Sequence, residues 1–257
     1  MLHWWITQIE EDSVRDHCAR LAAPQSTNDL VEAFLALLHS DHTAAIGVAL
    51  DYYHSYESMY RHGIENPFEP YDTEVLDRAR RLLQQTPTIA SHQPEAKEDG
   101  ANHASALAAM MNLAENSDAD LIASVLRRAT TSEVKRGAAL AAAGILEDAD
   151  TPPLQLVDSL RSLVLNDHNS YYERSAAISA LSESDSDAAY SVILQVTRLS
   201  AIELQAQAAI ALVERDFSGY REEIERAIAH WPQDVGYPAT KLLAILSDKA
   251  NDYGKQN

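Results

Sequence analysis

Residues Ser132–Asp148, SEVKRGAALAAAGILED, form the stretch that decides the fold. Most of these residues are alanine or other good helix formers, so a helix is predicted over the whole stretch. The small side chains of the alanines and of Gly144 let a neighbouring helix approach closely. The segment is therefore predicted to be an inner packing helix, with the basic pair Lys135 and Arg136 near its start.

The same order of small and large residues recurs along the chain. Glu173–Leu181 and Leu204–Asp216 align with the first stretch on the large residues Leu140, Ile178 and Ile210, at intervals of 38 and 32 residues. Further copies of the pattern occur at Thr43–Leu50, His103–Ala109 and Tyr237–Leu243. A period of this length is typical of stacked helix pairs.

One copy carries a family resemblance. Ser132-Glu133-Val134-Lys135-Arg136, with the alanine-rich helix and Gly144 that follow, resembles the second helix of a HEAT repeat. That pattern is a polar cap, a valine and arginine pair, small residues and a terminal glycine. The resemblance covers residues 26–248, although Ala206 and Pro238 replace the basic residue that Arg174 keeps. It implies an all-α fold class, a right-handed α-solenoid of about six HEAT-like helix pairs.

The composition agrees with an all-helical chain. Glycine and proline number only 8 and 9 among 257 residues, and no alternating run of β-branched residues predicts a strand. Because stacked repeats share one continuous core, residues 1–257 are predicted to form a single domain. Its special segments are an N-terminal capping helix in residues 1–25, a loop insertion at 86–100 and a frayed tail at 249–257.

Two of these segments have alternative roles. The leading helix, Leu2–Ala22, is predicted to cover the bare apolar face of the first repeat, but Trp4 and Trp5 suit a binding anchor as well. The insertion TPTIASHQPEAKEDG loses the helical period and gains proline and charge. A loop of that length is either functional or disordered.

The net charge of −19 restricts the possible partners. Acids outnumber bases by 17 to 7 in residues 1–100 and by 22 to 13 in residues 101–257, so the excess is spread over the chain. Such a surface repels nucleic acid and anionic membranes, and it complements a basic protein. The alternative is that the acidity serves solubility alone. Arg127, Arg128, Lys135 and Arg136 form one local basic cluster.

The N-terminus and the single cysteine indicate the compartment. Met1–Ile9 lacks the basic start of a signal peptide, and no apolar run approaches the ~20 residues of a membrane helix. One cysteine, Cys18, allows neither an intramolecular disulfide nor a thiolate metal cage. A cytoplasmic protein without a membrane partner is predicted.

Catalytic motifs are missing from the sequence. The ten histidines form no zinc-protease motif, and none is followed by the glutamate with which some HEAT-repeat oxygenases bind iron. There is no phosphate-binding glycine loop and no nucleophile elbow. His54 and Glu57 could share a helix face with His62, but polar residues at this spacing are common on helix surfaces. We expect no catalytic residue, no metal and no cofactor.

Acidic residues are concentrated where one repeat is predicted to end and the next to begin. Stacking would place these turns along one edge, and their carboxylates would form an acidic edge for a partner. The competing explanation is that Asp and Ser cap helix N-termini. A cap needs one acid per turn, whereas these turns hold two or three. The acidic-edge candidates are Asp118, Asp120, Asp148, Asp150, Asp185 and Asp187.

Tyr52, Tyr56 and Tyr60 recur every four residues and therefore share one face of a predicted helix. This stripe either packs against the next helix, with its hydroxyls at the wet edge, or forms an aromatic contact surface.

These observations predict a non-catalytic scaffold that binds a partner protein, preferably a basic one, by its concave face or acidic edge. Small acidic helical-repeat chains without catalytic residues resemble bacterial immunity proteins, which cover the active site of a toxin. The alternative is an enzyme similar to HEAT-like lyases, which would need a cleft where residues such as His54, Tyr56 and His103 converge. The sequence leaves the oligomeric state open.

Overall fold

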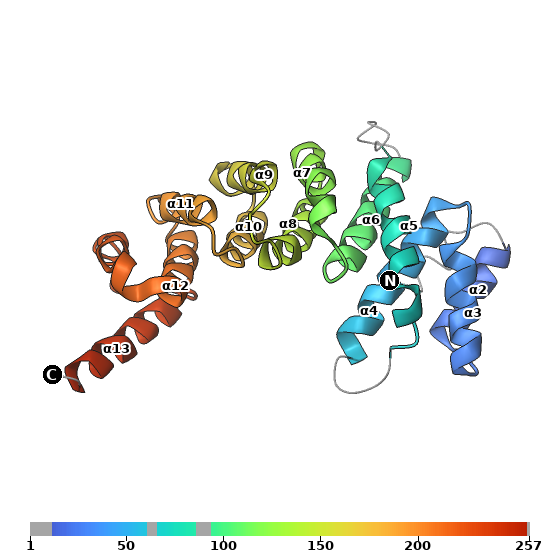
Figure 1. Cartoon of the computed structure of the whole chain (residues 1–257), viewed down its shortest axis with the longest axis horizontal. Coiled ribbons are helices and arrows are strands. Elements are labelled where there is room, and N and C mark those ends of the chain that lie inside the picture. Colours follow the sequence, from blue (N-terminus) through green and yellow to red (C-terminus); the bar gives the residue numbers. More distant parts are fainter. Residues whose placement is uncertain (1–11, 61–65, 86–93, 256–257) are drawn as a thin grey trace. The chain divides into compact units, whose positions relative to one another are not determined.

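The computed structural model describes residues 12–60, 66–85 and 94–255, and within these ranges the regular structure is helical, without a β-strand (Figure 1). The predicted all-α class is confirmed. The chain divides into two compact units, Met1–Ile145 and Leu146–Asn257. Each unit has a core of its own, and the single continuous domain stays a prediction.

The first unit contains seven α-helices within its described part. Helix α6 is its centre, because it packs on both α4 and α5. Helices α2, α3 and α4 pack in chain order, and α5 also contacts α7. The elements are α2 (Asp12–Ala22), α3 (Thr27–Leu38), α4 (Thr43–Tyr60), η1 (Glu69–Tyr71), α5 (Asp72–Gln84), α6 (Pro94–Met110), η2 (Asn116–Asp118), α7 (Ala119–Arg128) and α8 (Ser132–Glu147).

Aromatic side chains fill the core beside α3 and α4. Phe34 and Phe68 are fully buried with ring centroids 4.4 Å apart, and Tyr53 lies 6.5 Å from Phe34. The Tyr53 hydroxyl donates a hydrogen bond of 2.7 Å to Asp72, so burial leaves its polar end satisfied. Each fully buried phenylalanine contributes about 1.5–3 kcal/mol by leaving water.

Helix α2 packs against α3, and its role as a cap of the first repeat stays a prediction. The side chains of Val14, Cys18 and Leu21 on α2 are buried. Burial raises the pKa of Cys18 to about 11, because a low-dielectric surrounding disfavours the thiolate. Trp4 and Trp5 lie outside the described residues.

The predicted loop at 86–100 is too long at its C-terminal end, since α6 begins at Pro94. A proline fits the first turn of a helix because it has no backbone N–H to leave unpaired. The Glu, Ala and Lys that follow favour the helix. Composition alone made this stretch resemble a loop, and its remaining residues, 86–93, lie outside the described part of the chain.

Glycines set the spacing around α6. A Cβ atom on Gly47 of α4 would collide with the buried side chain of Asn102 on α6. A Cβ atom on Gly144 of α8 would lie 2.9 Å from the backbone carbonyl oxygen of Met111, which follows α6. The predicted close approach to the Ser132–Asp148 helix is therefore present, at its glycine.

The second unit contains α9 (Leu154–Leu165), α10 (Tyr171–Ser182), α11 (Asp187–Val196), α12 (Ile202–Ile228) and α13 (Ala239–Lys255). Ser170 and Ser186 cap α10 and α11, each by accepting a hydrogen bond from a backbone N–H three residues on. Helix α9 contacts α10 and α11, whereas α12 contacts α10, α11 and α13. The predicted frayed tail, 249–257, is helical as far as Lys255, because no proline or glycine precedes Gly254 there.

Helix α12 folds back on itself at Asp216. That residue has φ −157° and ψ 89°, and its carboxylate accepts a 3.0 Å hydrogen bond from the N–H of Gly219, as an N-cap does. In a straight helix Gln205 and Trp231 would be about 39 Å apart, at 1.5 Å per residue. Instead the Trp231 indole N–H donates a 2.7 Å hydrogen bond to the Gln205 side chain. The parts of α12 before and after Asp216 are thus the two arms of a helical hairpin.

Candidate functional site

The acidic-edge candidates fall into buried and exposed groups. Asp118 is 3% exposed, and both of its carboxylate oxygens bind Arg80, at 2.6 Å to Nε and 3.0 Å to Nη2. It also accepts a 2.9 Å hydrogen bond from the N–H of Glu115. Asp118 therefore belongs to the core of the first unit, and its prediction as an edge residue needs this correction: a partner would have to displace Arg80 to reach it.

The other five acidic-edge candidates are exposed. Asp120 lies on the first turn of α7, and Asp187 lies on the first turn of α11 with one ion pair, 3.3 Å to Arg215. Ser186, rather than either neighbouring acid, caps α11. Asp148, Asp150 and Asp185 lie in the turns between helices. The second unit thus has four solvent-exposed carboxylates whose presence is not explained by helix capping.

The tyrosine stripe of α4 is partly built into the core. Tyr52 and Tyr56 are half-buried, and their rings meet Phe68 edge-on at centroid distances of 6.0 and 5.0 Å. This arrangement agrees with the packing interpretation for these two residues. The side chain of Tyr60 lies outside the described residues.

A pocket of about 280 Å³ lies between α10, α12 and α13. Its lining includes hydroxyl and amide groups: Ser175, Ser179 and Ser182 of α10 and Gln207 of α12. The Gln207 amide nitrogen donates hydrogen bonds of 3.1 Å to the Ser175 carbonyl oxygen and to the Ser179 hydroxyl. We call this pocket, with these four residues, the serine groove.

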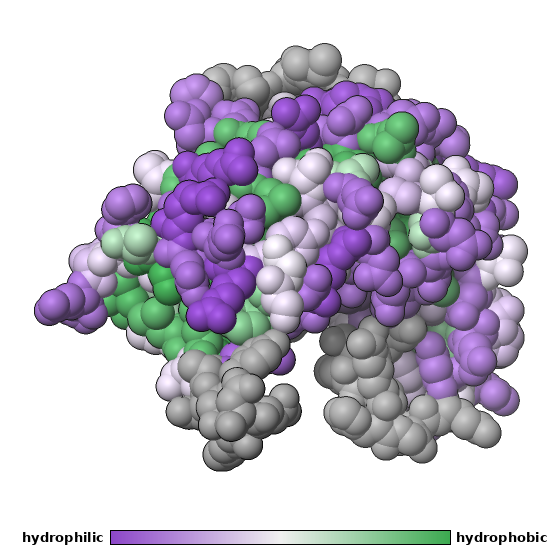
Figure 2. All heavy atoms as spheres, turned by 60° about the vertical axis from the view of Figure 1, so that its left-hand side comes forward, coloured by the Kyte–Doolittle hydropathy of each residue, from purple (hydrophilic) through white to green (hydrophobic). Residues whose placement is uncertain are grey.

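Exposed tyrosines border the serine groove. Tyr171 and Tyr237 line it and are 40% and 75% exposed, and Tyr172 is 65% exposed with its ring 5.5 Å from that of Tyr171. Glu214 and Lys241 also line the pocket. Figure 2 shows hydrophilic side chains over most of the face it presents, with smaller hydrophobic areas between them. We call Tyr171, Tyr172 and Tyr237 the rim tyrosines; they are among the large hydrophobic residues that are exposed in the described part of the chain.

The rim tyrosines were not predicted from the sequence, although a signal for them was present. Tyr171 and Tyr172 directly follow the helix cap Ser170, and Tyr237 begins the copy of the pattern at Tyr237–Leu243. An aromatic residue at the start of a helix made of small residues has few large neighbours to pack against within its own helix. Such a position favours an exposed ring.

The lining of the serine groove consists largely of groups that can form hydrogen bonds. The groove offers hydroxyls, one amide, one acid and one amine, without a nucleophile that is hydrogen-bonded to a base. Within the described ranges, no three His, Cys, Asp or Glu side chains come close enough together to hold a metal ion. None of the described helices combines the length and apolar character that a bilayer crossing requires.

Both histidines of the alternative enzymatic cleft lie in the first unit. His103 is buried, and its Nε2 lies 3.0 Å from the Leu82 carbonyl oxygen, so that nitrogen donates a hydrogen bond. His54 is half-buried on α4. The nearby acid, Asp51, has a raised pKa because burial disfavours its charged form, although His54 lowers it in part.

We expect Asp51→Asn to raise the free energy of unfolding at neutral pH. Since the folded pKa of Asp51 lies above its unfolded value, stability falls as the pH rises from the unfolded to the folded pKa and stays lower above it. The variant removes this loss, so its stability should exceed that of the wild type at pH 7 and approach it at pH 4. Urea unfolding across this range measures the difference, and the exposed Asp41→Asn is the control. A variant less stable than the wild type at pH 7 would contradict the assignment.

No protein-family model matches this chain, and no curated protein matches it either.

Proposed function

We propose that this protein is a non-catalytic scaffold that binds a partner protein through the serine groove and its tyrosine rim. The observation that carries the proposal is the exposure of Tyr171 and Tyr237 in the lining of one polar pocket, with the exposed Tyr172 against the ring of Tyr171. Exposed aromatic rings gain free energy when a partner covers them, and tyrosine is enriched among the residues that dominate binding energy.

The chemistry of the groove supports a protein as the ligand. Tyrosine has only two side-chain torsions, so it loses little conformational entropy on binding, and its hydroxyl can still pair at the edge of an interface. The serine hydroxyls and the Gln207 amide supply donors and acceptors below the rings. A peptide backbone, with alternating N–H and C=O groups, is complementary to such a lining.

The helix contacts in the second unit support a solenoid of HEAT-like pairs. Taking α9 with α10 and α11 with α12 as pairs, first helices contact each other and second helices contact each other. That is the stacking expected of helical repeats, in which each repeat contacts its neighbours. The serine groove is lined by the second helices, α10 and α12, and by α13. In this arrangement it belongs to the proposed concave face.

Charge indicates the kind of partner. Asp148, Asp150, Asp185 and Asp187 are exposed in the same unit as the groove, and the chain carries a net charge of −19. A basic protein is the natural complement of this surface. We propose an immunity-type role in the cytoplasm, in which the scaffold covers the functional surface of a basic partner such as a nuclease toxin.

The test is capture of partners from cells of the source organism, with tagged wild-type protein and two variants at low and moderate salt. The first variant carries Tyr172→Ser and Tyr237→Ser in the rim. The control variant, Leu154→Ser, removes another exposed apolar side chain, 63% exposed on α9 outside the groove. We expect one basic protein at equal stoichiometry with the wild type and the control, and an affinity at least about tenfold weaker with the rim variant.

Two results would overturn this proposal. One is a partner that the rim variant and the control bind equally well. The other is retention of no protein at all by the wild type at low salt. The charge-reversal variant Asp148→Lys with Asp150→Lys separates the roles of the groove and the acidic edge, because an electrostatic edge changes the association rate and its dependence on salt.

A further inference from the structure

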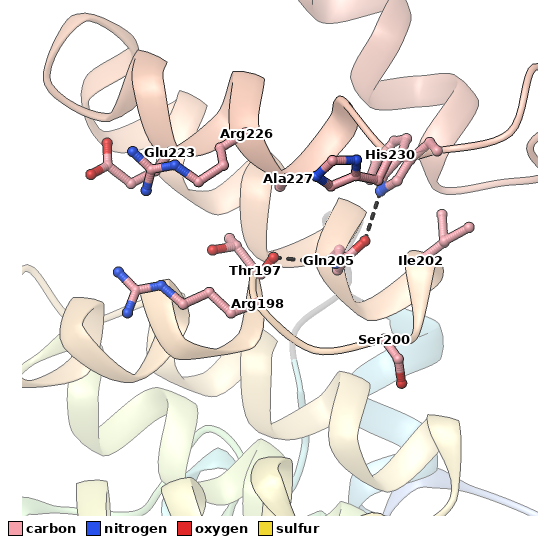
Figure 3. Close-up of a pocket in the computed structure, with 10 residues that line it drawn as sticks. Thr197, Arg198, Ser200, Ile202, Gln205, Glu223, Arg226, Ala227 and His230 are labelled. Atoms are coloured by element: carbon pink, nitrogen blue, oxygen red, sulfur yellow. Dashed lines mark hydrogen bonds between the residues drawn. The ribbon is translucent and has the colours of Figure 1, made fainter.

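A second pocket, of about 430 Å³, lies between the two arms of the α12 hairpin and the turn that precedes α12 (Figure 3). One wall comes from Thr197–Gln205 and the other from Glu223–Trp231. We call it the hairpin pocket. It shares no lining residue with the serine groove, so its occupancy is a separate question from the proposed scaffold function.

The floor of the hairpin pocket is already hydrogen-bonded. The Gln205 side chain accepts from the Trp231 indole N–H at 2.7 Å and donates to the Thr197 carbonyl oxygen at 3.3 Å. The Thr197 hydroxyl donates to the Leu194 carbonyl oxygen at 2.9 Å. These groups hold the two walls together and have little capacity left for a neutral polar ligand.

The unused hydrogen-bonding capacity lies with the arginines. Arg198 and Arg226 come from opposite walls, and Figure 3 shows both side chains extending toward the same side of the pocket. Both are exposed, and within the described part of the chain neither forms an ion pair with a carboxylate. Arg20, Arg80, Arg215 and Arg221, by contrast, all pair with acids. In a chain of net charge −19, two arginines that line one pocket with a single acid, Glu223, give a local excess of positive charge.

The other residues that line the hairpin pocket indicate which kind of molecule could carry the anionic group. Ile202, Ala227 and the half-buried Trp231 give an apolar wall, and the indole of Trp231 is fixed by Gln205. His230 adds ring nitrogens, and Glu223 is the one acid of the lining. A flat or aliphatic body fits the apolar wall, while guanidinium groups bind the paired oxygens of carboxylate and phosphate.

We infer that the hairpin pocket binds a small organic oxyanion, a phosphate ester or carboxylate attached to an apolar body, with Arg198 and Arg226 on the oxyanion and Trp231 against the body. Both arginines contribute charge, and Glu223 limits the net positive charge of the pocket. The site therefore selects a ligand that combines an anionic group with an apolar part over an inorganic anion.

Phenyl phosphate, benzoate, inorganic phosphate and benzyl alcohol are the probes. Each probe is titrated into the protein, and binding is measured by calorimetry and by the NMR resonance of the Trp231 indole N–H. The variant Trp231→Phe, which lacks this resonance, assigns it. We expect phenyl phosphate or benzoate to shift this resonance and to bind at least tenfold more tightly than inorganic phosphate and benzyl alcohol. The relative affinities of the first two probes identify the preferred oxyanion.

The variant Arg198→Gln with Arg226→Gln is expected to weaken the binding of the preferred probe at least tenfold. The control is Arg221→Gln, on the same arm of α12 but outside the pocket lining, where the arginine pairs with Glu225 at 2.7 Å. The control should retain wild-type affinity, and added salt should weaken the wild-type complex.

The inference is overturned if the double variant binds as the wild type does, if benzyl alcohol binds as well as the anions, or if no probe at millimolar concentration shifts the Trp231 resonance. Far-UV circular dichroism establishes that the variants remain folded. If the double variant unfolds, the affinity of the single variant Arg198→Gln for the preferred probe is measured instead. This affinity and the salt dependence of the wild-type complex then decide between the outcomes.

Discussion

The substitution Arg80→Leu is expected to lower the free energy of unfolding by about 3 kcal/mol, because it leaves a buried carboxylate without its counter-ion. Asp118 has a side chain only 4% exposed, and Arg80 holds it by two hydrogen bonds. After the substitution, the Glu115 N–H is the one remaining donor of the three described above. The Asp118 pair also raises the pKa of Arg80, so the charged guanidinium is the stable form.

Urea unfolding followed by circular dichroism measures this loss. Arg81→Leu is the matched control, because Arg81 is the next residue of α5 and is exposed. A surface substitution of this kind changes stability by about 0.5 kcal/mol or less. Equal effects of the two substitutions would show that Asp118 does not depend on Arg80.

The substitution Gly144→Ala is expected to destabilise the protein by about 2 kcal/mol, by overpacking. The new Cβ atom would lie 2.9 Å from the Met111 carbonyl oxygen, which belongs to the backbone and cannot rotate away. Helix α8 would have to move, and that cost exceeds the gain of up to about 1 kcal/mol that alanine brings to a helix.

Gly100→Ala in α6 is the control, and it is expected to change the stability in the opposite direction. Its Cβ atom would lie 3.7 Å from a methyl carbon of Thr131, which is an ordinary contact. We expect this variant to be more stable than the wild type by up to about 1 kcal/mol, through helix propensity alone. Thermal unfolding of both variants makes the comparison, and a stabilising Gly144→Ala would exclude the close contact with Met111.

Local signals in the sequence predict much of the fold. Ser26 caps α3 by accepting a hydrogen bond from Asp29, as its position before an apolar run indicates. The break within α12 is at Asp216, the residue at which the copy of the pattern at Leu204–Asp216 ends. Its consequence, a reversal that brings Gln205 to Trp231, depends on packing between the arms, and a helical period carries no information about that packing.

The candidate sites were harder to predict, because they depend on partners distant in sequence. Asp118 and Asp120 are alike in sequence, but only Asp118 meets Arg80, 38 residues earlier, and becomes buried. The serine groove and the hairpin pocket each bring together segments whose neighbourhood follows from tertiary packing. Residue type alone does not distinguish the arginines that pair with acids from Arg198 and Arg226.

The burial of Cys18 makes this chain convenient for site-specific labelling. It is the single cysteine of the sequence, it is fully buried, and its pKa of about 11 keeps it protonated at neutral pH. Maleimides and dithio reagents attack exposed thiolates, so they leave the native side chain unmodified. A cysteine introduced at an exposed position such as Tyr237 is then the one reactive thiol in the folded protein. Fluorophores or cross-linkers can be attached there while Cys18 stays in the core.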